Sequence, residues 1–327
     1  MSSRERNAAD PLRLGLVGCG RLAELGYVPA LASVPGLRLV AVADPDPDRR
    51  DLVARLGATG AGVSAGIATF PGLAALLADA EVDALVLATP TAAHVDDATL
   101  AASAGVVALV EKPPAPDAAA ASAMLTLTPT PRLGFNRRFD PAAQGLRDAV
   151  ASSGRVDLNL TINYRRAGWN AHQVRDDALL DLGPHLVDWA RWLTAGEVLD
   201  VRCRDFGPER AHLEISMTRG RAVIHAATDR PHLERIEARD GAGQLLARHR
   251  TGGLVDGVRG RLSRGPHPLV VSLAGQLAAF ARALCGDPAA DLGTVADGHA
   301  AMVVIDAART SAAQHGRTVP VSPPAES

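Results

Sequence analysis

The chain contains a single lysine, Lys112, among 34 basic residues; every other basic residue is arginine. On a solvated surface the two residues are nearly equivalent, but a compact ammonium can share or transfer a proton whereas a guanidinium does not deprotonate. The sole lysine is therefore a candidate for chemistry on composition alone. It stands in the tripeptide Glu111-Lys112-Pro113, directly after an apolar run typical of a buried strand.

A carboxylate and an imidazole form a second candidate pair, in the segment Asp181-Leu182-Gly183-Pro184-His185. Asp181 and His185 are four residues apart, so they share one face of a helix. Pro184 is tolerated only in a first turn, which puts the pair near a helix N-terminus. Histidine is the usual acid/base near neutral pH, and Asp188 could orient it. The alternative is an Asp N-cap beside a surface histidine. Because no third ligand follows at a recognisable spacing, we expect no metal site.

A glycine pattern near the N-terminus predicts a dinucleotide site. The apolar run Leu14–Val17 leads into Gly18-Cys19-Gly20-Arg21-Leu22-Ala23, a G-x-G-x-x-A pattern. Gly18 allows a tight turn, and Gly20 lets the backbone approach a pyrophosphate at a helix N-terminus. Asp44 ends the next apolar run, about 20 residues on, where a carboxylate hydrogen-bonds the adenosine ribose. Since its charge would repel a 2′-phosphate, we expect NAD rather than NADP.

The elements that must position these residues alternate between short apolar runs and helical stretches. The apolar runs are Leu12–Val17, Leu37–Ala43, Ala84–Ala88, Val106–Val110 and Arg132–Phe135. The helical stretches are Ala23–Ala32, Asp48–Leu56, Leu73–Ala78, Ala92–Ala104 and Ala118–Leu125. Such alternation predicts an α/β fold with a doubly wound parallel sheet, a Rossmann domain over residues 1–136. Ligands of such sheets bind outside the carboxyl ends of the strands, where Thr89, Pro90 and Lys112 fall.

The pattern changes after residue 151, and residues 137–327 are expected to form an α+β domain with a large, mostly antiparallel sheet. Its β-like segments are Arg155–Tyr164, Val198–Arg204, His212–Met217, Ala222–Ala227 and Leu233–Arg239. Its expected helices are Leu179–Leu193, Val271–Cys285 and His299–Ala313, the last of them able to pack back on the first domain.

The stretch Arg248–Pro268, rich in Gly and Arg, is the only long candidate loop. Its arginines are interpreted as solvated surface charge, with binding of a substrate phosphate or carboxylate as the alternative. These arginines are Arg248, Arg250, Arg259, Arg261 and Arg264.

Composition limits the class of protein. Apolar residues make up 47% and charged residues 21%, as in ordinary globular proteins. A net charge of −2 creates no field that favours nucleic acid or an anionic membrane. Cys19, Cys203 and Cys285 lie far apart without a CxxC pair, which suits a reducing compartment. No stretch reaches the roughly 18 apolar residues of a membrane span, and the polar start lacks a signal peptide. We expect a cytoplasmic protein that binds neither nucleic acid nor membrane.

Taken in order, these motifs resemble the glucose–fructose oxidoreductase / inositol dehydrogenase family, often called Gfo/Idh/MocA. The resemblance lies in Gly18–Arg21, Ala43–Pro45, Ala88–Pro90 with His94, Glu111–Pro113, Gly134–Phe139 and Leu180–His185. In that family the E-K-P lysine and the D-x-G-x-H aspartate and histidine line the active site. The resemblance therefore implies catalytic roles for Lys112, Asp181 and His185. It also implies a homodimer or homotetramer formed through the C-terminal sheet.

Two segments depart from the family pattern. The segment from Lys112 to Asn136 is shorter than usual, and Arg175-Asp176-Asp177 stands where many members carry glycines.

The sequence thus predicts hydride transfer between NAD and a secondary alcohol or ketone of a sugar, cyclitol or sugar derivative. His185 would take the hydroxyl proton, Lys112 would polarise the carbonyl oxygen, and Asp181 would fix the substrate or the imidazole. Expected cofactor contacts are Gly18, Cys19, Gly20, Arg21, Leu22, Asp44, Thr89, Pro90, His94, Glu111 and Lys112. Expected substrate contacts are Asn136, Arg138, Tyr164, Trp169, Asp181 and His185. Two alternatives are an NAD-dependent glycoside hydrolase or eliminase using transient oxidation, and a catalytically silent NAD-binding regulatory protein.

Overall fold

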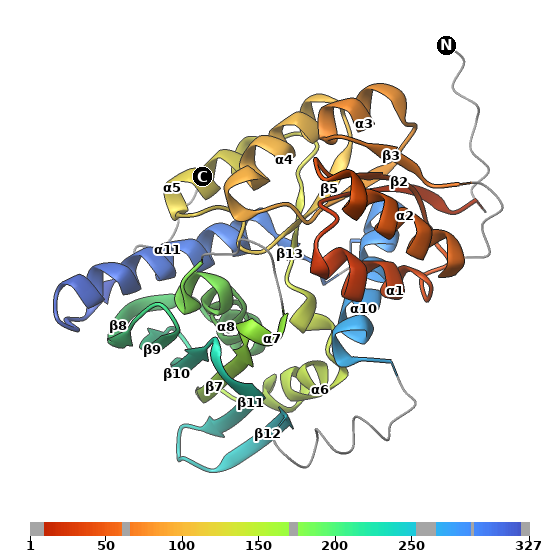
Figure 1. The fold of residues 1–327 in the computed structure, drawn as a ribbon. Helices are drawn as coiled ribbons and strands as arrows, with labels where there is room; N and C mark the ends of the chain where they lie inside the picture. The colour runs from red at the N-terminus through yellow and green to blue at the C-terminus, as the bar shows by residue number, and fades with distance from the viewer. Residues whose placement is uncertain (1–9, 61–65, 170–175, 253–265, 289–290, 322–327) are drawn as a thin grey trace.

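The computed structural model describes residues 10–60, 66–169, 176–252, 266–288 and 291–321. Within these ranges the chain forms two seven-stranded sheets, each covered by helices (Figure 1). The N-terminal third builds most of the first sheet, and the second sheet is built from the chain after residue 155.

The first sheet is parallel except at one edge. In spatial order its strands are β13 (Gly293–Thr294), β6 (Arg132–Gly134), β5 (Val107–Glu111), β4 (Ala84–Leu87), β1 (Leu12–Val17), β2 (Leu37–Ala43) and β3 (Ala68–Phe70). Neighbouring strands run parallel, and only β13 pairs with β6 in the antiparallel sense. The chain reverses its direction of winding between β1 and β4, and ligands of such sheets bind outside the carboxyl ends of the strands at this point.

Helices cover both faces of the first sheet, which explains why its strands are apolar along their whole length. One face carries η1 (Ala23–Tyr27), α1 (Val28–Leu31), α2 (Pro47–Gly60) and α10 (Pro268–Leu284). The other carries α3 (Leu73–Asp79), η2 (Thr91–Ala93), α4 (His94–Ser103), α5 (Ala118–Ser122) and η3 (Ala123–Thr126). Helix α10 comes late in the chain, yet its Leu273, Leu277 and Phe280 are buried against η1 and α1.

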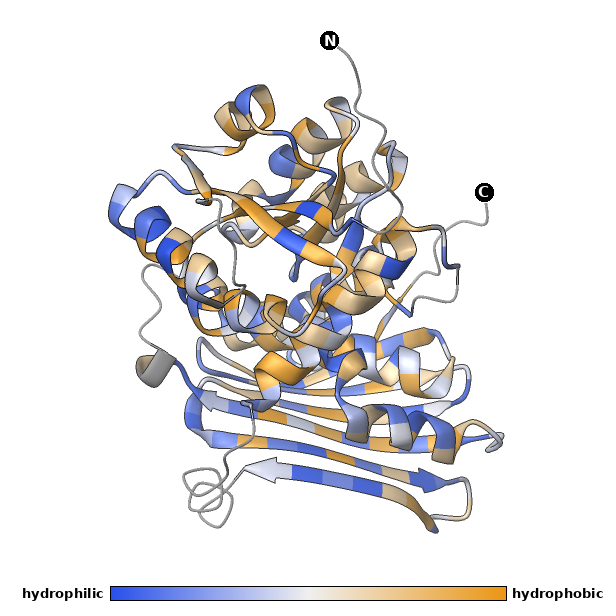
Figure 2. Ribbon diagram, turned by 90° about the vertical axis from the view of Figure 1, so that its right-hand side faces the viewer, coloured by the Kyte–Doolittle hydropathy of each residue, from blue (hydrophilic) through white to orange (hydrophobic). Residues whose placement is uncertain are grey.

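The second sheet has one buried and one open face. In spatial order its strands are β12 (Leu245–Gly252), β11 (Asp229–Asp240), β7 (Val156–Arg165), β10 (Gly220–Ala227), β9 (Arg210–Met217), β8 (Val198–Phe206) and β14 (Val319–Pro320). All neighbouring pairs are antiparallel except β7 with β10. Hydrophobic and polar residues alternate along these strands, as expected for a sheet with a single buried face (Figure 2).

Three helices cover the buried face of the second sheet: α6 (Pro141–Val150), α8 (Ala178–Thr194) and α11 (Val295–Ala313). Helix α11 also contacts α5, β6 and β13, so it links the two halves of the molecule (Figure 1). In the described part of the chain, no helix is long and apolar enough to cross a membrane.

The predicted fold class, a Rossmann domain followed by an α+β domain with a mostly antiparallel sheet, is confirmed. The candidate loop Arg248–Pro268 is wrong in part, because residues 248–252 belong to β12 and Pro268 begins α10. Residues 253–265, with Arg259, Arg261 and Arg264, lie outside the described residues. Strand β12 resembled a loop because its arginines alternate onto the open face, opposite polar positions of β11.

Candidate active site

The dinucleotide motif ends β1 and opens η1. Gly18 has φ +91°, and a Cβ atom there would lie 2.4 Å from the Ala88 carbonyl oxygen. Gly20 has no atom within 4 Å of the position that a Cβ would take, so its backbone faces open space. The turn thus presents backbone N–H groups at the carboxyl edge of the sheet, as a pyrophosphate requires.

Asp44 follows β2 and lies beside this turn. Its carboxylate accepts hydrogen bonds from the backbone N–H of Cys19 at 2.8 Å and of Asp46 at 2.9 Å. The side chain is buried and its orientation is fixed by both oxygens. Arg50 donates to the Asp44 carbonyl oxygen at 2.9 Å. Together with the open surface at Gly20, this arrangement fits an adenosine ribose and pyrophosphate.

Other expected cofactor residues surround the turn. Burial raises the pKa of the Cys19 thiol to about 12, so the side chain stays a neutral thiol, and the Cys19 N–H is already bound to Asp44. Arg21 forms an ion pair with Glu24 at 2.8 Å. Thr89 donates to Asp97 at 2.7 Å.

Lys112 follows β5 and reaches across to the second half of the chain. Its Nζ donates to the Asp181 carbonyl oxygen at 3.0 Å and lies 3.4 Å from Asp181 Oδ1. Asp181 is in the first turn of α8, which begins after the N-cap Asp177. Asp177 accepts a hydrogen bond from the Leu180 N–H at 2.8 Å. The structure therefore brings the sole lysine and the predicted aspartate together.

The Asp181 carboxylate is held from a second side by strand β7. Tyr164 donates its hydroxyl hydrogen to Asp181 Oδ2, and Arg166 Nη2 donates to the same oxygen at 2.9 Å. Burial raises the pKa of Asp181, but Lys112, Tyr164 and Arg166 outweigh it, so the net pKa lies below its usual value. Burial and the Asp181 charge raise the pKa of Tyr164. Asp181 is therefore ionised, and Tyr164 serves as a hydrogen-bond donor.

His185 lies one turn further along α8 and is 5% exposed. Its Nδ1 is buried and has no hydrogen-bond partner within the described residues. Burial lowers the pKa of His185 well below its usual value, and the charges of Lys112 and Arg137 lower it further. The imidazole is therefore neutral. The expectation that Asp188 orients it is wrong, because both Asp188 oxygens accept from Arg138 instead.

Two expected substrate contacts have structural roles in the interior. Arg138, in η4 (Asn136–Phe139), binds Asp188 at 2.5 and 2.9 Å and lies 3.0 Å from an oxygen of Asp297. Its guanidinium is thus engaged by buried carboxylates and is not available to a substrate. Asn136 is buried and donates to the Ser272 hydroxyl of α10 at 2.8 Å, which ties the two halves together.

Two expected cofactor contacts point inward as well. The ring nitrogens of His94 each lie 2.7 Å from a carbonyl oxygen, that of Pro113 for Nδ1 and that of Thr89 for Nε2. Glu111 is buried and accepts from the Tyr27 hydroxyl at 2.5 Å and from the Lys112 N–H at 3.1 Å. His94 joins the loops after β4 and β5, and Glu111 joins the end of β5 to η1, so both side chains position the site rather than face the cofactor.

Arg166 is the residue of this cluster that sequence reasoning missed. It begins α7 (Arg166–Trp169), directly after β7, and Tyr164 lies two positions earlier. Strand alternation, continued by two residues, would have placed Arg166 on the same side as Tyr164. Trp169, an expected substrate contact, ends α7, and its side chain lies outside the described residues.

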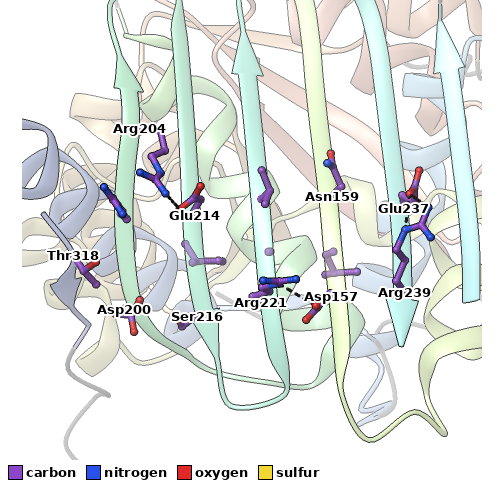
Figure 3. A pocket seen from close by; sticks show the side chains of 15 residues that line it. Asp157, Asn159, Asp200, Arg204, Glu214, Ser216, Arg221, Glu237, Arg239 and Thr318 are labelled. Atoms are coloured by element: carbon purple, nitrogen blue, oxygen red, sulfur yellow. Dashed lines mark hydrogen bonds and ion pairs between the residues drawn. The ribbon is translucent and has the colours of Figure 1, made fainter. Parts of the chain in front are cut away.

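A separate hollow lies on the open face of the second sheet (Figure 3). It is lined by charged side chains that pair within the face, including Arg204 with Glu214 at 2.8 Å and Arg221 with Asp157 at 3.0 Å. The residues around Lys112 and Asp181 do not line it.

Fold and site together define a class of protein. A Rossmann domain with a dinucleotide turn presents a lysine to an aspartate and a neutral histidine of an α+β domain, as in two-domain, nicotinamide-dependent oxidoreductases. The comparison with known families agrees. Residues 12–130 match the oxidoreductase family with NAD-binding Rossmann fold, GFO_IDH_MocA. The predicted resemblance is confirmed over residues 12–130, which match the NAD-binding Rossmann domain of that family.

Curated relatives point the same way. Inositol 2-dehydrogenase 2 of Saccharopolyspora erythraea is 32% identical over 196 residues, which cover 58% of this chain and 55% of that protein. The chain thus spans little more than half the length of the curated relatives that it matches.

Two solved structures share the fold over nearly the whole chain. Scyllo-inositol dehydrogenase from Lactobacillus casei, with bound NAD(H) and scyllo-inositol, has a TM-score of 0.75 at 17% identity and covers 95% of this chain and 99% of its own. The WlbA dehydrogenase from Bordetella pertussis, with NADH and UDP-GlcNAcA, has a TM-score of 0.75 at 19% identity and covers 97% and 99%. At these identities the likeness concerns the fold.

Proposed function

We propose that this protein is an NAD-dependent oxidoreductase acting on a secondary alcohol or ketone of a sugar, cyclitol or sugar derivative. The observation that carries the proposal is the contact of Lys112 Nζ with Asp181, one helical turn from the neutral His185. When bound, NAD supplies the hydride acceptor. The turn at Gly18 and Gly20 and the carboxylate of Asp44 would hold it.

The chain's own side chains divide the remaining work. In alcohol oxidation His185, neutral and with an unpartnered ring nitrogen, accepts the hydroxyl proton. Lys112 directs one or two of its three N–H groups at Asp181, which leaves a donor for the substrate oxygen. Asp181, held by Tyr164 and Arg166, keeps the lysine in place. In ketone reduction the same proton returns from His185.

The relatives support the substrate class. Inositol 2-dehydrogenases and a UDP-N-acetylglucosamine 3-dehydrogenase are among the curated proteins similar to this chain. Both act, by name, on the hydroxyl groups of a ring. Because the chain spans only part of their length, the activity is proposed here from the site.

The proposal is tested by incubating the protein with NAD and a panel of cyclitols, aldoses, uronates and amino sugars while following NADH absorbance. Net NADH formation with one of them is the expected result. Release of a leaving group without net NADH would instead identify a hydrolase or eliminase. NAD binding with neither reaction across the panel would favour a regulatory protein.

We also propose that the open face of the second sheet forms a homodimer or homotetramer interface. Acidic and basic side chains alternate across that face (Figure 3). Such a face can set opposite charges against a second copy of itself, because a two-fold interface is self-complementary. Light scattering should give twice or four times the chain mass. Arg221→Glu, which places a like charge beside Asp157, should shift the protein towards the monomer; an unchanged mass would place the interface elsewhere.

A further inference from the structure

The charges around Asp181 do not balance. Two cations reach its carboxylate, Lys112 at 3.4 Å and Arg166 at 2.9 Å, and the third partner, Tyr164, is neutral. The side chains of Lys112, Asp181 and Arg166 are only 18, 13 and 25% exposed. The cluster therefore holds one positive charge in excess where solvent screens it weakly, an arrangement that favours a bound anion.

Neighbouring residues form no further ion pair with these two cations within the described residues. Arg137, whose charge reaches His185, is paired with its own carboxylate, Glu234. The charge of Glu111 is felt by Lys112, but its oxygens accept from the Tyr27 hydroxyl and the Lys112 N–H, and the ion pair of Nζ is with Asp181. Arg166 therefore shares its carboxylate partner with Lys112.

Arg166 also has donors to spare. Its Nη2 donates to Asp181, and its Nε lies 3.4 Å from the Tyr164 hydroxyl. Its Nη1 makes no hydrogen bond to another residue in the described part of the chain. A guanidinium has five donors in a planar fork that matches a carboxylate. Because Asp181 and Tyr164 already hold the plane of this fork, little conformational entropy is lost when an anion binds.

From these observations we propose that Arg166 binds a carboxylate group of the substrate, and that the preferred substrate is a sugar acid or cyclitol acid rather than a neutral polyol. The inference rests on the proposed function and assigns Arg166 as its specificity-determining residue. Lys112 keeps its role at the reacting oxygen, so the two cations of the cluster serve two different groups of one substrate.

The test compares pairs of sugars that differ only at C6, where one carries a hydroxymethyl group and the other a carboxylate. Glucose with glucuronate, and galactose with galacturonate, are measured by calorimetry for binding to the protein with NADH present, and by NADH formation with NAD. The acid of each pair should bind about 10- to 100-fold more tightly than its neutral partner, the range of a charge-assisted hydrogen bond. Glucose 6-phosphate is included, because a guanidinium also fits a phosphate.

Variants assign the preference to a residue. Arg166→Gln should reduce the ratio of acid to neutral affinity towards one, and Arg166→Lys should leave an intermediate ratio, since it keeps the charge but not the fork. Arg165→Gln is the matched control: Arg165 is the exposed neighbour in β7 and should keep the ratio of the unaltered protein.

The outcomes separate this inference from the proposed function. It is wrong if neutral compounds bind as well as their acids, if no acid in the panel binds, or if Arg166→Gln leaves the ratio unchanged. Tighter binding of glucose 6-phosphate than of glucuronate would mean that Arg166 binds a phosphate group of the substrate and not a carboxylate. NADH formation from neutral compounds alone would uphold the oxidoreductase and overturn the role of Arg166. Selective acid binding without NADH formation would uphold the role of Arg166 and overturn the oxidoreductase.

Discussion

Lys112 and Asp181 stand 69 positions apart in the chain, yet Lys112 Nζ donates to the Asp181 carbonyl oxygen at 3.0 Å and reaches its carboxylate at 3.4 Å. Lys112 directly follows β5 of the first sheet, and Asp181 lies in the first turn of α8, one of the helices that cover the second sheet. A backbone carbonyl and a carboxylate thus hold the same ammonium. The orientation of the lysine therefore depends on how the two halves of the molecule pack together.

Replacement of Lys112 by arginine should lower kcat even though the charge is kept. The longer planar fork cannot place a donor where the compact ammonium lies between Asp181 and the substrate oxygen. A loss of about 10²–10³-fold is expected for a positioned hydrogen-bond donor to the reacting oxygen, with NADH affinity nearly unchanged. Steady-state kinetics and the fluorescence of bound NADH measure the two quantities. Near-full turnover by Lys112→Arg would exclude the ammonium from the chemistry.

Alanine at Gly18 should weaken both the fold and NAD binding. Its Cβ would lie 2.4 Å from the Ala88 carbonyl oxygen and 2.8 Å from the Thr89 nitrogen, backbone atoms that cannot move cheaply. Its φ of +91° would add strain. Gly20→Ala meets no atom within 4 Å and should weaken NAD binding while keeping the melting temperature. Gly36→Ala, whose Cβ would be in ordinary contact, should change neither. Calorimetry and thermal unfolding distinguish the three variants.

Asp44→Asn should narrow the preference for NAD over NADP. The isosteric amide keeps an oxygen for one of the two N–H groups, from Cys19 and Asp46, but removes the charge that repels a 2′-phosphate. Arg50, which donates to the Asp44 carbonyl oxygen, then attracts that phosphate without an opposing carboxylate. NADP affinity should rise by about tenfold, the effect of one charge-assisted contact. Asp51→Asn, on the exposed side of α2, is the control. Tighter binding of NADP by the unaltered protein would contradict the role of Asp44.

Arg138 should matter for stability rather than for substrate binding. It lies in the interior between Asp188 and Asp297, so Arg138→Met leaves Asp188 without its cation, while Asp297 keeps its ion pair with Arg191. Loss of one partner of a buried pair costs about 3–5 kcal/mol of unfolding free energy. Arg147→Met removes the more exposed pair with Asp291 and should cost about 1 kcal/mol or less. Urea unfolding measures both. Equal losses of unfolding free energy in the two variants would show that the buried ion pair stabilises the fold no more than the exposed one.

Local pattern predicted five of the seven strands of the first sheet to within a residue or two, because strands buried on both faces read as continuous apolar runs. It missed β3 and β13, the short strands at the two edges. Helical spacing likewise placed Asp181 and His185 on one face of α8. The prediction that Asp188 orients His185 was wrong, because the Asp188 carboxylate binds Arg138, which lies 50 positions earlier in the chain. Arg166 escaped notice for a related reason. Its contact with Asp181 depends on how β7 packs against α8, which no local periodicity encodes.

His185→Ala should lower kcat by about 10²–10⁴-fold while NAD affinity stays nearly constant, the usual effect of losing a positioned base. Because burial keeps the pKa of His185 well below its ordinary value, the base is already neutral where an ordinary histidine begins to be protonated. The acid limb of the kcat profile should therefore fall below about pH 6.5, the ordinary histidine value. If His185→Ala retains near-full turnover with a verified substrate, the base lies elsewhere, and Lys112 is the next residue to replace.

The same lowered pKa of His185 predicts how stability changes with pH. The unfolded chain binds a proton at His185 below about pH 6.5, whereas the folded chain does so only well below that value. The unfolded state thus binds more protons in this window, so the unfolding free energy decreases as the pH falls from about 7 towards the folded pKa, by at most about 1.4 kcal/mol per pH unit. His94, whose pKa burial also lowers, contributes with the same sign. Urea unfolding of the unaltered protein and of His185→Gln is measured at pH 7.5, 6.5 and 5.5. The comparison separates the contribution of His185 from that of His94, because only the His185 contribution is absent from the variant. A parallel loss of stability in both proteins would mean that His185 has the same pKa in the folded and unfolded chains, which would contradict the lowered pKa.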